Sequence, residues 1–233
     1  MAQRTQDFAS ALWTNGTMLD RDAVTPIETS HQHSLSEFVR GEIERRIAAG
    51  LLAPGDKLNE AAWAALLRVS RGPVREAFRA LEQAGLVRNE KHRGVFVRSV
   101  SVAEAAELGV VRTILEEAAC RMLAARIDAA QVAVLREWLG AMRDALVRED
   151  RAAYGRACDA FRDALVAAAG NQKLHETYRR CVGELCLSRA MPPEDDTMEV
   201  SYAAHRAILN ALATRNADDA AALMRSQGGA CAW

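Results

Sequence analysis

The spacing of apolar residues between positions 35 and 98 restricts the fold more than any other feature of this sequence. A first amphipathic helix is predicted there by apolar residues at every fourth position, Leu35, Val39, Ile43 and Ile47. Gly50 ends this helix, and Pro54-Gly55 predicts a turn after it. A second, short helix is expected to run from Asn59, which suits an N-cap, to Leu67.

A third helix is predicted after the break at residues 69–73. Ser70 or Gly72 suits its N-cap, and Pro73 fits its first turn, where a helix leaves the backbone N–H without a partner. Its inward face follows the helical spacing of Val74, Ala77, Phe78 and Leu81. Two short strand patterns, 86–88 and 95–97, then flank a polar tip and predict a β-hairpin. Three helices followed by a hairpin are the plan of a winged helix-turn-helix, a fold that binds DNA.

Beyond Ser99 the pattern is helical throughout. Six helices are predicted, over residues 102–126, 129–147, 152–169, 172–188, 198–214 and 218–226. Their short connections favour an all-α bundle of six or seven helices. The sequence therefore predicts a mainly α chain in three parts: a flexible N-terminal arm at residues 1–30, a winged helix-turn-helix domain at 31–99, and the helical bundle at 100–233.

The distribution of charge supports a DNA-binding part. Residues 31–99 carry 12 Lys and Arg against 8 Asp and Glu, although the whole chain has a net charge of -1. Arg71, Arg75 and Arg79 follow one another at four-residue spacing, so they form one outward stripe on the third helix. Arginine can hold guanine or clamp phosphate. For any single arginine, a solvated face is the alternative.

Other classes of protein are disfavoured. No apolar run approaches the roughly 20 residues of a membrane helix, and the first residues lack the apolar core of a signal peptide. We therefore expect a cytoplasmic protein without membrane contact. The 5 cysteines include no CxxC pair, which argues against a disulfide framework. No nucleophile elbow, HExxH or phosphate-binding glycine loop is present, so we do not expect an enzyme.

Three blocks of the first half, GLLAPGDKLNE at 50–60, VSRGPVREAF at 69–78 and LEQAGLV at 81–87, resemble the winged-helix module of the GntR superfamily. The resemblance implies that Arg71 and Arg75 contact operator bases and phosphates, and that Gly94 lets the wing approach the groove. The remaining expected DNA contacts are Arg79 on the helix and Lys91, His92 and Arg93 at the wing tip. The family usually has Thr where this chain has Gly72, so one hydroxyl contact to phosphate is lost.

Three looser blocks of the second half, VRTILE at 111–116, AFR at 160–162 leading to AAGN at 168–171, and AHRAIL at 204–209, resemble the FCD domain of the FadR-like subfamily. The resemblance implies effector binding and dimerisation. Many FCD domains hold a divalent metal through one Asp and three His, and those positions are Cys158, Arg162, His205 and Gln227 here. One ligand survives and Arg162 would repel the ion, so we expect no metal and no other cofactor. A soft metal on Cys158 and His205 stays open.

A cationic effector pocket is then expected from Arg112, Cys158, Arg162, Asn171, His205 and Gln227. Arginine matches a carboxylate with its planar fork, so the expected ligand is an organic acid. Two structural alternatives remain open: an ion pair between Arg112 and Glu116 within one helix, and an ordinary buried histidine at 205.

From these residues the chain is identified as a member of the GntR superfamily, FadR-like subfamily. We expect a homodimer that binds a palindromic operator in double-stranded DNA, represses transcription, and responds to a small metabolite. The alternatives are a metal-sensing regulator with an altered ligand set, and an enzyme that uses Cys158 and His205.

Overall fold

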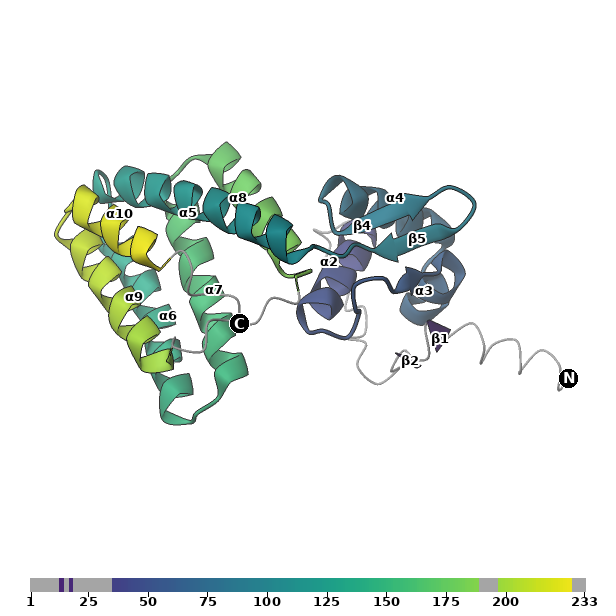
Figure 1. Cartoon of the computed structure of the whole chain (residues 1–233), viewed down its shortest axis with the longest axis horizontal. Helices are drawn as coiled ribbons and strands as arrows, with labels where there is room; N and C mark the ends of the chain where they lie inside the picture. Colours follow the sequence, from purple (N-terminus) through teal and green to yellow (C-terminus); the bar gives the residue numbers. More distant parts are fainter. Residues whose placement is uncertain (1–12, 15–16, 19–34, 189–196, 228–233) are drawn as a thin grey trace, which may run out of the picture. The chain divides into compact units, whose positions relative to one another are not determined.

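The computed structural model describes residues 13–14, 17–18, 35–188 and 197–227 (Figure 1). Two short strands, β1 (Trp13–Thr14) and β2 (Thr17–Met18), pair antiparallel near the N-terminus. The rest of the arm expected at residues 1–30 lies outside the described residues. The chain divides into two compact units, residues 1–100 and 101–233, and each is treated by itself below.

The described part of the first unit holds three helices, α2 (Leu35–Ala48), α3 (Glu60–Leu67) and α4 (Arg71–Gln83). Val39 and Ile43 of α2 are fully buried, as their spacing predicts. Asn59 caps α3 as expected, because its side-chain oxygen accepts the N–H groups of Ala61 and Ala62. The spacing did not single out Trp63, which is also buried in this core.

A three-stranded antiparallel sheet completes the first unit. Its strands are β3 (Lys57–Leu58), β4 (Val87–Glu90) and β5 (Gly94–Val97), in the order β3-β5-β4. The predicted hairpin is therefore present as β4 and β5. Strand β3 was not predicted, because two residues are too few for an alternating pattern to show. The three helices and the winged sheet confirm the predicted fold of this unit.

The second unit is a helical bundle, as predicted (Figure 1). Its helices are α5 (Val102–Ala124), α6 (Ala129–Val147), α7 (Arg151–Ala168), α8 (Gln172–Leu185), α9 (Met198–Ala213) and α10 (Ala217–Ser226). Most helices begin at a polar residue whose side chain accepts a backbone N–H of the first turn, and Asp128 with Gln131 makes a full capping box on α6. None of the described helices is long and apolar enough to cross a membrane.

The core of the bundle lies between α5, α6, α7, α9 and α10, which pack against one another. Leu123, Met142 and Phe161 are fully buried in it. α8 contributes fewer buried side chains and packs against α5 and α7. Charged side chains from α5 and α7 are buried next to this apolar core, and they form the cluster described below.

Candidate DNA interface and buried polar cluster

Three arginines form an exposed stripe along α4. Arg71, Arg75 and Arg79 are all exposed, whereas Val74, Ala77, Phe78 and Leu81 bury the opposite face of the helix. Arg75 lies 3.9 Å from a carboxylate oxygen of Glu60 on α3. Because both side chains are exposed, solvent weakens this ion pair, and a DNA phosphate can take the place of Glu60. The stripe therefore has the geometry that reading a groove requires.

The start of α4 has no side-chain cap. Ser70 is the N-cap in extended conformation, but its side chain accepts no hydrogen bond from the first turn. Gly72 is helical, and a Cβ placed there would meet only Ser70 Oγ, at 3.9 Å. A helix N-terminus with unsatisfied N–H groups attracts anions such as phosphate. Space is therefore available at residue 72 for a Cβ atom, the first atom of the Thr side chain that the resemblance would place there.

The wing tip is a three-residue turn between β4 and β5 with exposed basic side chains, Lys91, His92 and Arg93. His92 and Gly94 have positive φ angles, 64° and 108°. Glycine adopts the second of these without strain, so Gly94 fixes the path of the turn. Arg93 forms an ion pair with Glu90, which orients its guanidinium at the tip.

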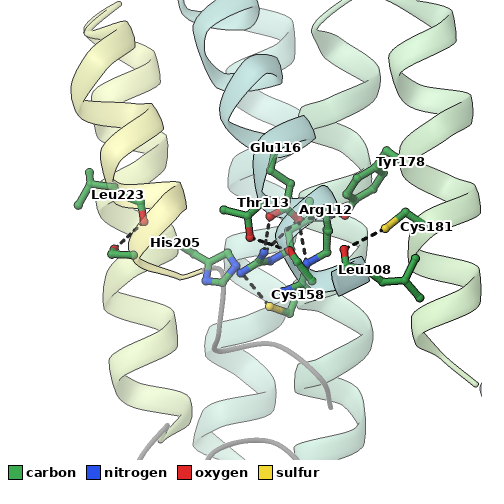
Figure 2. A network of polar contacts seen from close by, with 12 residues as sticks. Leu108, Arg112, Thr113, Glu116, Cys158, Tyr178, Cys181, His205 and Leu223 are labelled. Atoms are coloured by element: carbon green, nitrogen blue, oxygen red, sulfur yellow. Dashed lines mark hydrogen bonds and ion pairs between the residues drawn. The ribbon is translucent and has the colours of Figure 1, made fainter. Parts of the chain in front are cut away.

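A buried ion pair lies inside the second unit. One terminal nitrogen of Arg162 on α7, Nη1, donates to both carboxylate oxygens of Glu116 on α5, at 3.0 and 2.9 Å. Tyr178 on α8 donates its hydroxyl to the same carboxylate at 3.3 Å (Figure 2). Burial and the nearby Glu116 raise the pKa of Tyr178 well above its ordinary value, so the phenol remains a donor.

Arg112 joins this cluster from α5. Its Nε lies 4.0 Å from Glu116, and both side chains are buried. The pairing of Arg112 with Glu116 that the sequence left open thus exists, but the contact of Glu116 with Arg162 is shorter and reaches both carboxylate oxygens from one nitrogen. Two guanidinium groups therefore share one buried carboxylate. The exposed Asp159 is also within electrostatic reach of both arginines.

Cys158 and His205 form a second buried pair beside this ion pair. Cys158 Sγ lies 3.3 Å from His205 Nε2 (Figure 2). His205 Nδ1 lies 2.7 Å from the carbonyl oxygen of Ser201. Because a carbonyl only accepts, Nδ1 carries the proton and Nε2 accepts the Cys158 thiol proton. Burial, together with the charge of Arg162, lowers the pKa of His205 to about 4, so the ring is neutral at pH 7.

The other two expected effector residues lie elsewhere in the bundle. Asn171 is exposed at the start of α8, where its side-chain oxygen accepts the N–H of Leu174 at 3.1 Å. Its role is therefore that of a helix cap, and we leave it out of the candidate ligand site. Gln227 ends α10 and is buried; its Oε1 accepts no hydrogen bond from the described part of the chain.

The family's divalent metal does not fit these residues. Cys158 and His205 supply two donors, and among the described residues no group of three or more His, Cys, Asp and Glu side chains could hold a metal ion. Arg162 lies one turn along α7 from Cys158 and lowers the pKa of His205 through its charge, so it would also repel a cation.

The sequence predicted four side chains of this cluster and missed two. Arg112, Cys158, Arg162 and His205 do lie together, although far apart in sequence. Glu116 was considered only as a local partner of Arg112, and Tyr178 was not considered. The available signal was the presence of two arginines, Arg112 and Arg162, at positions expected inside the bundle. A buried charge needs a partner, so an acid such as Glu116 was to be expected beside them.

Comparison with known proteins identifies the class of protein. Residues 35–97 match the family of bacterial regulatory proteins called the gntR family, and residues 107–227 match the FCD domain. One relative, from Paenarthrobacter nicotinovorans, is named "Probable D-xylose utilization operon transcriptional repressor"; it is 33% identical over 179 residues, which cover 77% of this chain and 79% of the relative. The HTH-type transcriptional repressor RspR of Escherichia coli K12 is 29% identical, with 76% and 78% covered.

Solved structures agree with this assignment. A structure described as a transcriptional regulator GntR from Rhodococcus sp. RHA1 is 28% identical and has a TM-score of 0.67, with 84% of this chain and 94% of that chain covered. E. coli McbR/YncC shares the fold at 20% identity, with a TM-score of 0.74 and the same coverage. The protein is therefore a DNA-binding transcriptional regulator and not an enzyme. It belongs to the GntR family and carries an FCD domain.

Proposed function

We propose that this regulator is a repressor that binds a palindromic operator as a homodimer and releases it when a small organic acid binds to the FCD domain. The exposed stripe of α4 carries the DNA-binding part of the proposal. Arg71 and Arg75 are assigned to bases and phosphates of the major groove, and Arg79 to the backbone. The wing residues Lys91, His92, Arg93 and Gly94 lie beside the groove. The names of two relatives as repressors favour repression.

A homodimer is supported by an exposed apolar stripe on α5. Val110 and Ile114 are 62% and 59% exposed and lie one turn apart on the helix. Neighbouring large aliphatic side chains that are exposed to this extent are typical of a surface that binds another protein. An antiparallel pairing of two α5 helices centred on Ile114 places Glu107 opposite Arg121 of the second copy, because each is seven residues from the centre. Both of these side chains are exposed, so the stripe is self-complementary in charge as well as apolar.

A substitution in the stripe tests the dimer. Ile114→Glu is expected to shift the protein towards monomer in sedimentation velocity, because it places two carboxylates opposite each other at the centre of the pairing. Val147→Glu is the matched control, since Val147 is a similarly exposed apolar residue on α6. If Ile114→Glu leaves the sedimentation coefficient unchanged and Val147→Glu lowers it, the dimer uses α6 instead.

The effector part rests on the charge of the buried cluster. Arg112 and Arg162 bring two guanidinium groups to one buried carboxylate, that of Glu116, so the cluster offers planar N–H donors that match a ligand carboxylate. The exposed Asp159 lies within electrostatic reach of both arginines and would compete with the ligand for them. Ser201 Oγ, one turn before His205 on α9, is buried and has no hydrogen-bond partner among the described residues, so it is a polar atom that can select the rest of the ligand.

A thermal-shift screen followed by calorimetry tests the effector. Small organic acids are expected to raise the melting temperature of the full chain, since a ligand that binds only the folded state stabilises it. Isothermal titration of the best acid should then show at least tenfold weaker binding to Arg112→Gln than to the wild type. Equal binding to both proteins would contradict the carboxylate site. Binding of acyl thioesters with no response to acids would indicate an apolar ligand between the helices instead.

A further inference from the structure

Strand β3 brings a further lysine, Lys57, to the wing. This lysine belongs neither to helix α4 nor to the wing tip. β3 pairs antiparallel with β5, and Lys57 stands directly opposite Phe96 in this register. Directly opposite residues of an antiparallel pair project from the same face of the sheet. Lys57 is exposed, whereas its neighbour Leu58 is buried and anchors the strand in the core.

Phe96 holds two cations. Lys57 Nζ lies 5.8 Å from the centroid of the Phe96 ring, and Arg93 Cζ lies 5.6 Å from the same centroid. Both distances are within the range of cation–π contact. The ring thus favours one direction for each of the two side chains, and it places the positive charge of β3 next to that of the wing tip.

Gly94 provides the path along which Lys57 reaches the tip. A Cβ atom added at Gly94 would lie 3.1 Å from Lys57 Cε and 3.8 Å from Nζ. The Lys57 side chain therefore runs from β3 over the first residue of β5, which directly follows Arg93. The absence of a side chain at residue 94 thus serves two purposes: it allows the positive φ of 108° and it leaves room for the lysine.

Lys57 also keeps an uncompensated charge. Arg93 is paired with Glu90, but no acidic side chain of the described residues pairs with Lys57. Asp56, the acid next to it in sequence, accepts the backbone N–H of Ala53 at 2.8 Å. An ammonium group that is held in place, exposed and unpaired is a suitable donor to a phosphate oxygen.

We propose that Lys57 binds a backbone phosphate of duplex DNA, and that Phe96 and Gly94 position its ammonium group for this contact. The inference rests on the proposed DNA-binding role of the wing and adds a residue outside the recognition helix and the wing tip. Because the contact is to phosphate, Lys57 contributes to affinity for every sequence and not to the choice between sequences.

The salt dependence of DNA binding tests this contact. Fluorescence anisotropy measures binding of the full chain to a labelled duplex of random sequence at several salt concentrations. In Lys57→Met the slope of log K against log salt is expected to become less steep by about 1, because one phosphate contact releases about one counterion. Lys57→Arg should restore the wild-type slope, since it keeps the charge. Lys173→Met, an exposed lysine on α8 paired with Glu176, is the matched control and should leave the slope unchanged.

Each outcome bears on a different claim. If the wild type binds the duplex with a steep salt dependence and Lys57→Met binds with the same slope, the inference about Lys57 is wrong while the DNA-binding function stands. If the wild type does not bind duplex DNA, the proposed function fails and the inference with it. An equal loss in Lys57→Arg and Lys57→Met would show that the side chain supports the fold of the wing and does not contact phosphate.

Discussion

Removing one partner of the buried Arg162–Glu116 pair should destabilise the second unit strongly. Glu116 is fully buried and Arg162 is 1% exposed, so neither charge can be hydrated when the other is removed. Breaking such a pair typically costs 3–5 kcal/mol. In Arg162→Met, Tyr178 and Arg112 still face the Glu116 carboxylate, so we expect a loss of about 3 kcal/mol, at the lower end of that range.

A double-mutant cycle separates the pair from other effects of the substitutions. Urea unfolding followed by far-ultraviolet circular dichroism gives the free energy of unfolding of the wild type, Arg162→Met, Glu116→Gln and the double variant. Because the second substitution then removes a buried charge that has already lost its closest partner, the double variant should be more stable than the sum of the single losses predicts, by about 2 kcal/mol. Arg225→Met is the control, because it removes an exposed partner of Glu117 and should cost much less.

Additive losses would refute the reasoning, because they would mean that Arg162 and Glu116 do not depend on each other. Coupling of the two residues would also affect how the effector site is probed. Truncation of Arg162 both removes a candidate ligand contact and takes the closest partner from Glu116, so a lost effector response in that variant would not by itself identify a binding residue. Arg112→Gln is the cleaner probe, since its contact with Glu116 is longer.

Three further predictions follow from single sites. Gly72→Ala should raise the free energy of unfolding by about 0.5–1 kcal/mol, because the position is helical and has room for a Cβ, and Gly72→Thr should tighten DNA binding if its hydroxyl meets a phosphate; weaker binding of Gly72→Thr would argue against that contact. The pKa of His205 is about 4 in the folded protein against an ordinary 6.5, so between pH 6.5 and pH 4 the unfolded ring binds a proton and the folded ring does not. The free energy of unfolding should therefore fall by up to about 3 kcal/mol as the pH drops through this range, with no contribution above pH 6.5. In urea titrations, His205→Gln but not His92→Gln should flatten this pH dependence. Dialysed protein should contain well below one zinc, nickel or manganese ion per chain by elemental analysis, and stoichiometric metal bound by Cys158 and His205 would support the metal-sensing alternative.

Local patterns in the sequence predicted the elements well, since caps and periodicity are short-range properties. Asn59 and Asp128 cap their helices, and Val39 and Ile43 face the core. These features depend on residues within one or two turns of each other. Their positions can therefore be read before any tertiary structure is known.

Contacts between distant segments could not be predicted in the same way. Arg162 and Glu116 are 46 positions apart, and their pairing depends on how α5 and α7 pack. The contact of Lys57 with Phe96 likewise depends on a two-residue strand that no pattern reveals. Arg162 was predicted as a cation of a ligand pocket, and its burial beside Glu116 became visible only in the folded bundle.

The central claim is that α4 reads operator DNA, and one measurement tests it most directly. A duplex selected by the wild-type protein from a random-sequence pool is titrated with the wild type and with the Arg71→Ala/Arg75→Ala variant. We expect a palindromic selected site, and a loss of about 1–3 kcal/mol of specific binding for each arginine that contacts a base. If the double variant bound the selected duplex as tightly as the wild type, α4 would not be the recognition helix.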